Sequence, residues 1–297
     1  MNKERKRLVE LLKQFTSLST IQLPDDVHEK LQSLSQSETT ERARFFYDAM
    51  LANLDMAQVQ QRPLCQDTGI IQYFVEAGSH SPYLDIIQDA LREAVILATE
   101  ETPLRPNCVE VFDEKNTGNN AGTNIPWIDW QVIPNSSDLS IYIYLAGGGC
   151  SLPGSAKVLM PLDGYEGVVR FVLDQVTSYG INACPPLLLG IGIAGSVEVA
   201  AKLSKKALLR PIGSTNANTL GHELECRIEN AVNELGIGPG GAGGNQSLLG
   251  VHIEQAGRHP ATLAVGLSTA CWAHRRAHMI IHDDLRWEMP THKGVAL

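Results

Sequence analysis

The most apolar stretch of the chain reads Pro185-Pro186-Leu187-Leu188-Leu189-Gly190-Ile191-Gly192-Ile193-Ala194-Gly195. Its leucines and isoleucines predict a buried strand over 187–193, and the pattern that follows predicts a helix over 196–206. The three glycines match G-x-G-x-x-G, a dinucleotide-binding motif. About 20 residues further on, where that motif requires an acidic residue for the ribose, the sequence reads Leu208-Leu209-Arg210-Pro211-Ile212. Close packing of helix against strand is therefore our preferred explanation, with a nucleotide-dependent oxidoreductase as an alternative.

The rest of the sequence divides by its glycine content. The first 100 residues contain only Gly69 and Gly78, whereas 21 of the 26 glycines lie between Gly118 and Gly250. Helices are predicted at 3–17, 25–36, 39–61, 83–100, 165–179 and 219–235, and strands at 69–76, 248–254 and 261–268. We expect a mixed α/β (α+β) fold in which a helical N-terminal layer packs on a mixed β-sheet. Residues 1–297 are expected to form a single domain, with the helical layer over about 1–100 and a Gly-rich part over about 101–297.

Two further strands are predicted within the Gly-rich part, at 127–134 and 139–146. In the second, Ile141 and Ile143 alternate with Tyr142 and Tyr144, as in a half-buried strand. The segment Asn135-Ser136-Ser137-Asp138 between them is rich in turn residues. We therefore expect the two strands to form a hairpin.

Charge and hydropathy exclude several classes of partner. The chain has 24 Lys and Arg against 33 Asp and Glu, for a formal charge of −9. An acidic protein lacks the basic surface that nucleic-acid binding requires. The first residues are followed by leucines at helical spacing, unlike a secretory leader, and the apolar stretch at 185–201 is short for a membrane span and contains Glu198. We expect a cytoplasmic protein with no nucleic-acid or membrane partner.

Six cysteines are too few for a disulfide scaffold. The sequence contains no C-x-x-C pair of the kind that binds structural zinc. Three of them, Cys65, Cys184 and Cys271, lie in turn-like segments at the edges of predicted strands. Such turns can offer the fixed backbone and amide donors that a thiolate ligand needs. The other three are interpreted as bystanders, and a small core residue is the alternative for any buried cysteine. These three are Cys108, Cys150 and Cys226.

Cationic residues occur close to the same segments. They include Arg105, the pair Arg258-His259 and the run His274-Arg275-Arg276. In an acidic protein, arginines beside possible metal ligands suit an anionic small molecule, because guanidinium groups bind carboxylates in a bidentate manner. The alternative for each arginine is an ion pair on the surface.

Several motifs together resemble one family. In chain order they are Cys65-Gln66-Asp67-Thr68-Gly69, Asn116-Thr117-Gly118, Gly147-Gly148-Gly149, Cys184-Pro185-Pro186, and Arg258-His259 before Cys271. From about residue 20 to the C-terminus, the chain resembles the iron-sulfur-dependent class I hydro-lyases, which comprise class I fumarases and L-tartrate dehydratases. Within that family, Gly147–Gly154 and Cys271–Arg276 are most similar to the alpha chains of the tartrate dehydratases.

The resemblance implies a [4Fe-4S] cluster held by Cys65, Cys184 and Cys271, with one iron not bound by a protein thiolate. Such an iron acts as a Lewis acid toward the hydroxyl that departs from a 2-hydroxy dicarboxylate.

The family also implies roles for other residues. Asp67 would be a catalytic proton-relay group, with a purely structural turn as its alternative. The substrate-binding residues would be Gln66, Arg105, Gly148 and His259, and for His259 a structural histidine is the alternative.

Single-chain members of the family continue with a second domain that this sequence lacks. We therefore expect an alpha subunit whose active site is completed by a separate beta subunit, in an α2β2 assembly. Dehydration of L-tartrate to oxaloacetate is the leading hypothesis, and hydration of fumarate to malate is the alternative in the same class. A non-catalytic assembly subunit is the alternative from another class.

Overall fold

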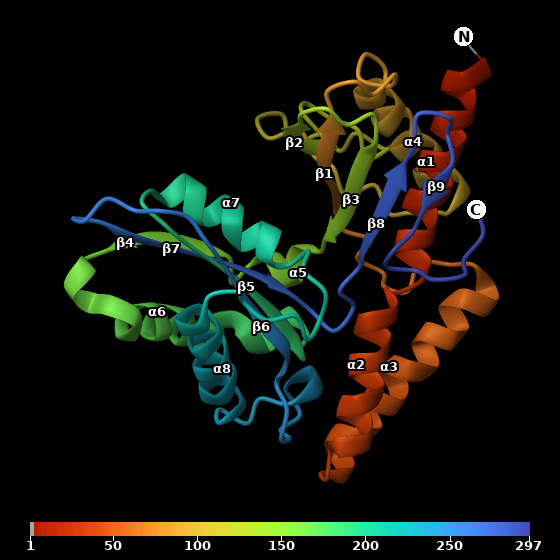
Figure 1. Cartoon of the computed structure of the whole chain (residues 1–297). Coiled ribbons are helices and arrows are strands. Elements are labelled where there is room, and N and C mark those ends of the chain that lie inside the picture. The colour runs from red at the N-terminus through yellow and green to blue at the C-terminus, as the bar shows by residue number, and fades with distance from the viewer. Residues whose placement is uncertain (1–2) are drawn as a thin grey trace. The chain divides into compact units, whose positions relative to one another are not determined.

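A computed structural model describes residues 3–297 and contains two compact units. Unit 1 comprises the chain up to Asp25, Asn53–Gly147 and Arg275–Leu297, and unit 2 comprises Asp26–Ala52 and Gly148–His274. Each unit has its own sheet, and helices pack against both sheets (Figure 1). The mixed α+β class is therefore confirmed, while the assignment of 1–297 to a single catalytic domain stays a prediction.

Unit 1 is built on a five-stranded sheet in the order β2-β1-β3-β8-β9. Its strands are β1 (Ile70–Gly78), β2 (Trp127–Ile133), β3 (Leu139–Ala146), β8 (Arg276–Ile281) and β9 (Trp287–Glu288). One face carries the apolar core, to which helices α1 (Lys3–Ile21) and α4 (Ile87–Glu101) contribute. On β3, Ile141 and Ile143 lie in this core, whereas Tyr142 stacks on the ring of His278, so the predicted alternation is confirmed.

The predicted hairpin of β2 and β3 is wrong. Strand β1 lies between them, parallel to β2 and antiparallel to β3. The segment that joins β2 to β3 crosses the end of β1, where Gly78 N donates to Asp138 O and His80 N donates to Ser136 O. Strand β1 takes the inner position because its side chains are largely buried, whereas those of β2 are largely exposed, as suits an edge strand.

Unit 2 contains a four-stranded sheet in the order β4-β7-β5-β6. Its strands are β4 (Ser155–Leu159), β5 (Leu187–Ala194), β6 (Leu248–Gln255) and β7 (Leu263–Ala270). Helix α7 (Val197–Ala207) packs on one face of the sheet. Helices α6 (Gly164–Tyr179) and α8 (Thr219–Asn233) supply the core on the other face. This division follows the alternation along β5, whose Leu187, Leu189 and Ile191 enter the α6 and α8 core.

The glycines of β5 serve the packing of α7. A Cβ atom at Gly190 or Gly192 would lie closer than 3.0 Å to a main-chain oxygen of α7, at Ser204 or Ala200 respectively. Both glycines lie within the strand instead of in a loop before the helix. The packing interpretation of G-x-G-x-x-G is therefore confirmed.

The remaining helices are α2 (Asp25–Ser37), α3 (Glu41–Gln60) and the short α5 (Gly148–Ser151), together with the 3-10 turns η1 (Pro161–Asp163), η2 (Gly180–Ala183) and η3 (Pro239–Gly241). All the helices and strands predicted from the sequence are present, with ends that differ by a few residues. The sequence did not predict β4, β8, β9 or α5. Across residues 3–297, none of the helices combines the length and apolarity that crossing a membrane would require.

Candidate functional site

Cys65 lies in unit 1, between the end of α3 and the start of β1. The preceding residue fixes its position, because Leu64 N donates to Thr20 O at 3.0 Å and Asn53 Nδ2 donates to Leu64 O at 2.7 Å. The Cys65 thiol is half-buried, and its Sγ lies 3.7 Å from Gln66 Oε1. The thiol is thus presented from a rigid turn and stays accessible to a ligand.

The carboxylate of Asp67 organises the same turn. Its Oδ1 accepts a hydrogen bond from Gly69 N at 3.0 Å and another from Asn107 Nδ2 at 3.4 Å. Asn107 Nδ2 also lies 3.2 Å from Gly69 O. The turn role of Asp67 is therefore confirmed, and the same contacts fix the orientation of its carboxylate.

Arg105 is held beside this turn by its main chain. Arg105 N donates to the buried Thr68 Oγ1 at 3.1 Å, and Asn120 Nδ2 donates to Arg105 O at 2.9 Å. The Arg105 side chain itself is exposed. Unit 1 thus brings Arg105 beside the turn that carries Gln66 and Asp67, which precede it by almost 40 residues in the sequence.

Unit 2 brings together the other two candidate ligands. Cys184 has a left-handed backbone conformation (φ 58°) and precedes the cis peptide bond Pro185-Pro186. Cys271 directly follows β7, and Trp272 N donates to Cys184 O at 3.2 Å. Cys184 is exposed and Cys271 is half-buried. Two accessible thiols therefore lie on adjoining segments.

Gly148 begins α5, which lies near the same strand ends. Thr269 Oγ1, close to the end of β7, donates a hydrogen bond to Cys150 O in α5. A Cβ atom at Gly149 would be 3.7 Å from Asn182 O in η2, the turn that leads to Cys184. Gly148, Cys184 and Cys271 are therefore neighbouring parts of unit 2.

His259 lies at the other end of these strands. It precedes β7, and its loop adjoins Gly195 after β5, because a Cβ atom at Gly195 would be 3.3 Å from His259 N. An eight-residue strand spans roughly 26 Å, so unit 2 does not itself bring His259 beside Cys184 and Cys271. The His259 side chain is exposed, and its Nδ1 accepts from Ala261 N at 3.1 Å.

The neighbouring Arg258 has a structural role. Its Nη1 donates to the carbonyl oxygens of His259, Pro260 and Thr262 at 3.1–3.3 Å. These bonds fix the loop that carries His259.

The remaining cysteines differ in setting from the candidate ligands. Cys108 and Cys150 are buried, as expected for small core residues, whereas Cys226 is exposed on α8 with its Sγ 3.7 Å from the ring of His222. Within residues 3–297, the structure gathers no three His, Cys, Asp or Glu side chains into a group able to hold a metal ion. The choice of cluster ligands therefore rests on the local settings of the thiols and is a proposal.

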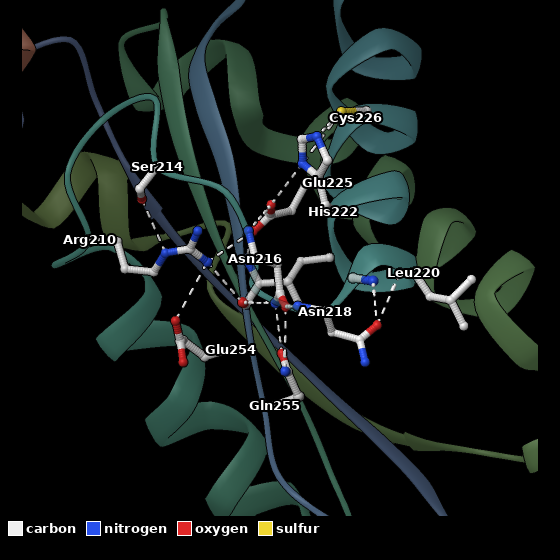
Figure 2. A network of polar contacts seen from close by, with 12 residues as sticks. Arg210, Ser214, Asn216, Asn218, Leu220, His222, Glu225, Cys226, Glu254 and Gln255 are labelled. Atoms are coloured by element: carbon white, nitrogen blue, oxygen red, sulfur yellow. Dashed lines mark hydrogen bonds and ion pairs between the residues drawn. The ribbon is translucent and has the colours of Figure 1, made fainter.

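Unit 2 also contains a buried ion pair that the sequence did not reveal (Figure 2). Arg210 Nη1 lies 2.9 Å from Glu225 Oε1, and Glu225 also accepts from Asn216 N and Ile253 N at 2.8 Å each. No local motif marks this pair, because its members come from different segments of the chain.

A pocket of about 360 Å³ adjoins this network, and its acidic lining includes Asp26, Glu29, Glu225 and Glu229. Within the described chain, it is lined by none of the site residues predicted from the sequence. Its carboxylates also make it unsuitable for a dianionic substrate.

Comparison with known proteins identifies the family. The family described as fumarate hydratase (Fumerase) matches residues 9–280, most of the chain. The chain belongs to this fumarate hydratase family. Its resemblance to the hydro-lyases, inferred from the motifs, is thereby confirmed.

Two relatives of the chain are similar to it over nearly their whole length. The L(+)-tartrate dehydratase subunit alpha of Escherichia coli K12 is 50% identical over 291 residues, which are 98% of this chain and 96% of that protein. The putative L(+)-tartrate dehydratase subunit alpha of Methanocaldococcus jannaschii is 39% identical over 272 residues, which are 90% of this chain and 95% of that protein.

Proposed function

We propose that this chain is the alpha subunit of a [4Fe-4S]-dependent hydro-lyase that dehydrates L-tartrate to oxaloacetate and water. The observation that carries the proposal is the 50% identity to a tartrate dehydratase alpha subunit over 98% of the chain. Fumarate hydration to malate is the second candidate, and the named relatives favour tartrate over it. The two substrates differ by one hydroxyl group, which a few polar contacts can distinguish.

Three thiols of the chain would hold the cluster, namely Cys65, Cys184 and Cys271. All three are at least partly accessible, whereas Cys108 and Cys150 are buried. Thiolate sulfur is the usual protein ligand of iron-sulfur clusters, so this donor set suits the group. When bound, the cluster supplies a Lewis-acidic iron that favours departure of the substrate hydroxyl.

The chain's own residues would bind the diacid and handle the proton. Arg105 and Gln66, beside the Cys65 turn, would bind substrate carboxylate or hydroxyl oxygens. Asp67, whose carboxylate is oriented by Gly69 N and Asn107 Nδ2, would relay the proton that is lost from the carbon next to the one that loses its hydroxyl.

Two further residues, Gly148 and His259, are proposed as substrate contacts. Gly148 would contribute a main-chain amide near Cys184 and Cys271. His259 is exposed and is held in an ordered loop, so its ring is available to a ligand.

A separate beta subunit would complete the active site, in an α2β2 assembly. Support comes from the relatives, which are called alpha subunits and are matched over 95–96% of their length. The beta subunit would add the remaining base and cationic groups.

Activity of the two-chain complex tests the proposal. The chain is co-expressed with its beta subunit, purified without oxygen and assayed for oxaloacetate from L-tartrate and for fumarate from malate. We expect L-tartrate to have the higher kcat/KM and the chain alone to turn over little of either acid. A preference for malate would replace tartrate by the second candidate, and full activity of the isolated chain would contradict the two-subunit site.

A further inference from the structure

Arg275 is a buried cation without a counter-charge. The residue is only 2% exposed, and its Nε and Nη1 atoms have no hydrogen-bond partner among the described residues. Removing an unpaired guanidinium from water has a large free-energy cost. A group outside the described chain is therefore expected to neutralise it.

The sheet register explains why the charge is buried. Leu145 N donates to Arg275 O at 3.1 Å, directly beside the β3–β8 pair Tyr144 and Arg276. Arg275 thus continues the alternating row of Ala277, Met279 and Ile281, whose side chains lie in the apolar core of unit 1. A guanidinium replaces an apolar side chain at the end of this row.

The same end of the sheet carries the Asp67 turn. On β1, Ile71 pairs with Leu145, which in turn lies opposite Arg275. Gly69, the last residue of the turn, comes two residues before Ile71. Two strand spacings separate β1 from β8, roughly 10 Å, so Arg275 lies across one strand from Ile71, at the end of the sheet from which the turn with Gln66 and Asp67 extends.

The half-buried Arg210 of unit 2 gives an internal contrast. Arg210 pairs with Glu225 and donates to Ile253 O and Ser214 Oγ, so protein groups stabilise most of its guanidinium. Unit 1 provides nothing comparable for Arg275 among the described residues.

We infer that Arg275 is a carboxylate-binding residue whose guanidinium pairs with a carboxylate of the bound dicarboxylate. Arginine suits this role because its planar fork can donate two parallel hydrogen bonds to one carboxylate. Only the identity of the diacid rests on the proposed function.

Thermal unfolding of the full chain tests the inference. The chain is titrated with L-tartrate, with sodium chloride of equal ionic strength as the reference. We expect L-tartrate to raise the unfolding temperature of the wild type. Arg275→Met, which keeps a side chain of similar length, is expected to raise the apparent Kd for tartrate roughly tenfold or more.

Arg210→Met is the matched control. It should lower the basal unfolding temperature, because it leaves Glu225 as an unpaired buried charge, and should leave the tartrate-dependent rise in place. Arg275→Met should unfold at the wild-type temperature or above, since it removes an unpaired charge. An undiminished tartrate response in Arg275→Met would overturn the inference, and so would a basal loss as large as that of Arg210→Met.

Kinetics of the two-chain complex separate this inference from the proposed function. If the wild-type complex turns over neither L-tartrate nor malate, the proposed function fails, while the tartrate titration still decides the role of Arg275. If the wild-type complex is active and Arg275→Met leaves the KM unchanged, the inference fails and the proposed function stands.

Discussion

Replacing Gly192 by alanine should destabilise unit 2 more than any other single added methyl group in β5 or β6. The new Cβ would lie 2.7 Å from Ser204 N and 2.9 Å from Ala200 C in α7, and closer still to Ala200 O. An ordinary van der Waals contact is about 3.4 Å or more, so α7 must move by roughly 1 Å. These atoms belong to the main chain of a helix, and no rotamer change can relieve the overlap.

Overpacking costs of this kind are typically 1–3 kcal/mol, and the rigid partner places Gly192→Ala near the upper limit, at about 3 kcal/mol. For a chain of this size, that loss corresponds to a fall in the unfolding temperature of roughly 6–10 °C. Urea and thermal unfolding followed by circular dichroism measure both quantities.

Gly250→Ala is the matched control, because it adds a methyl group to the neighbouring strand β6, where the nearest atom is Leu188 Cδ1 at 3.7 Å. Both substitutions reduce the conformational entropy of the unfolded chain equally, so Gly250→Ala should be neutral or slightly stabilising. Equal stability of the two variants would refute the packing explanation. If wild type bound a nicotinamide cofactor tightly and a normally folded Gly192→Ala did not, the dinucleotide-binding interpretation of the motif would be supported instead.

Three further predictions concern other sites. Glu225→Gln should lower the free energy of unfolding by about 3 kcal/mol, because it removes the buried counter-charge of the half-buried Arg210 and leaves only the more exposed Glu254, 3.5 Å away. Glu254→Gln should cost less than about 1 kcal/mol, and urea midpoints measure both losses. Burial, assisted by Arg276, lowers the pKa of His278 to about 4 from its ordinary 6.5. Between pH 6.5 and 4, the folded chain therefore binds fewer protons at His278 than the unfolded chain does. Over that range, the free energy of unfolding of wild type should fall by about 1–2 kcal/mol relative to His278→Gln, a figure that allows for the partial exposure of the ring. Finally, Asn107→Ala should lower kcat roughly tenfold without changing the iron content, since Asn107 orients Asp67; unchanged kcat would show that this hydrogen bond does not position the carboxylate.

Elements of unit 1 show how far periodicity predicts the fold. The alternation of β3 was sufficient to predict a half-buried strand with Ile141 and Ile143 on one face. Strand β8 was missed because its apolar row is short, Ala277, Met279 and Ile281, and alternates with Arg276 and His278. The burial of Arg276 depends on neighbouring strands that the local sequence does not specify. The hairpin prediction failed for a similar reason. Turn residues at 135–138 suit a tight hairpin and a connection across β1 equally well, and only the greater burial of β1 decides between them.

The site shows the same limit. Local motifs predicted the turn that Asp67 organises, because its hydrogen bonds are made within a few residues and to one nearby amide. The position of His259 depends instead on the length and direction of β7, which separates it from Cys271. The unpaired state of Arg275 depends on the whole packing of unit 1 and could not be inferred from its neighbours in the sequence.

The metal content of single-cysteine variants tests the central claim most directly. Wild type, Cys65→Ser, Cys184→Ser, Cys271→Ser and Cys226→Ser are purified without oxygen and analysed for iron and acid-labile sulfide. Cys226 is the control, because it is an exposed thiol outside the proposed ligand set. We predict about four irons and four sulfides per chain in wild type and in Cys226→Ser, and loss of most of both in each of the other three. Retention of the full complement in any of those three variants would contradict the assignment of that thiol as a cluster ligand.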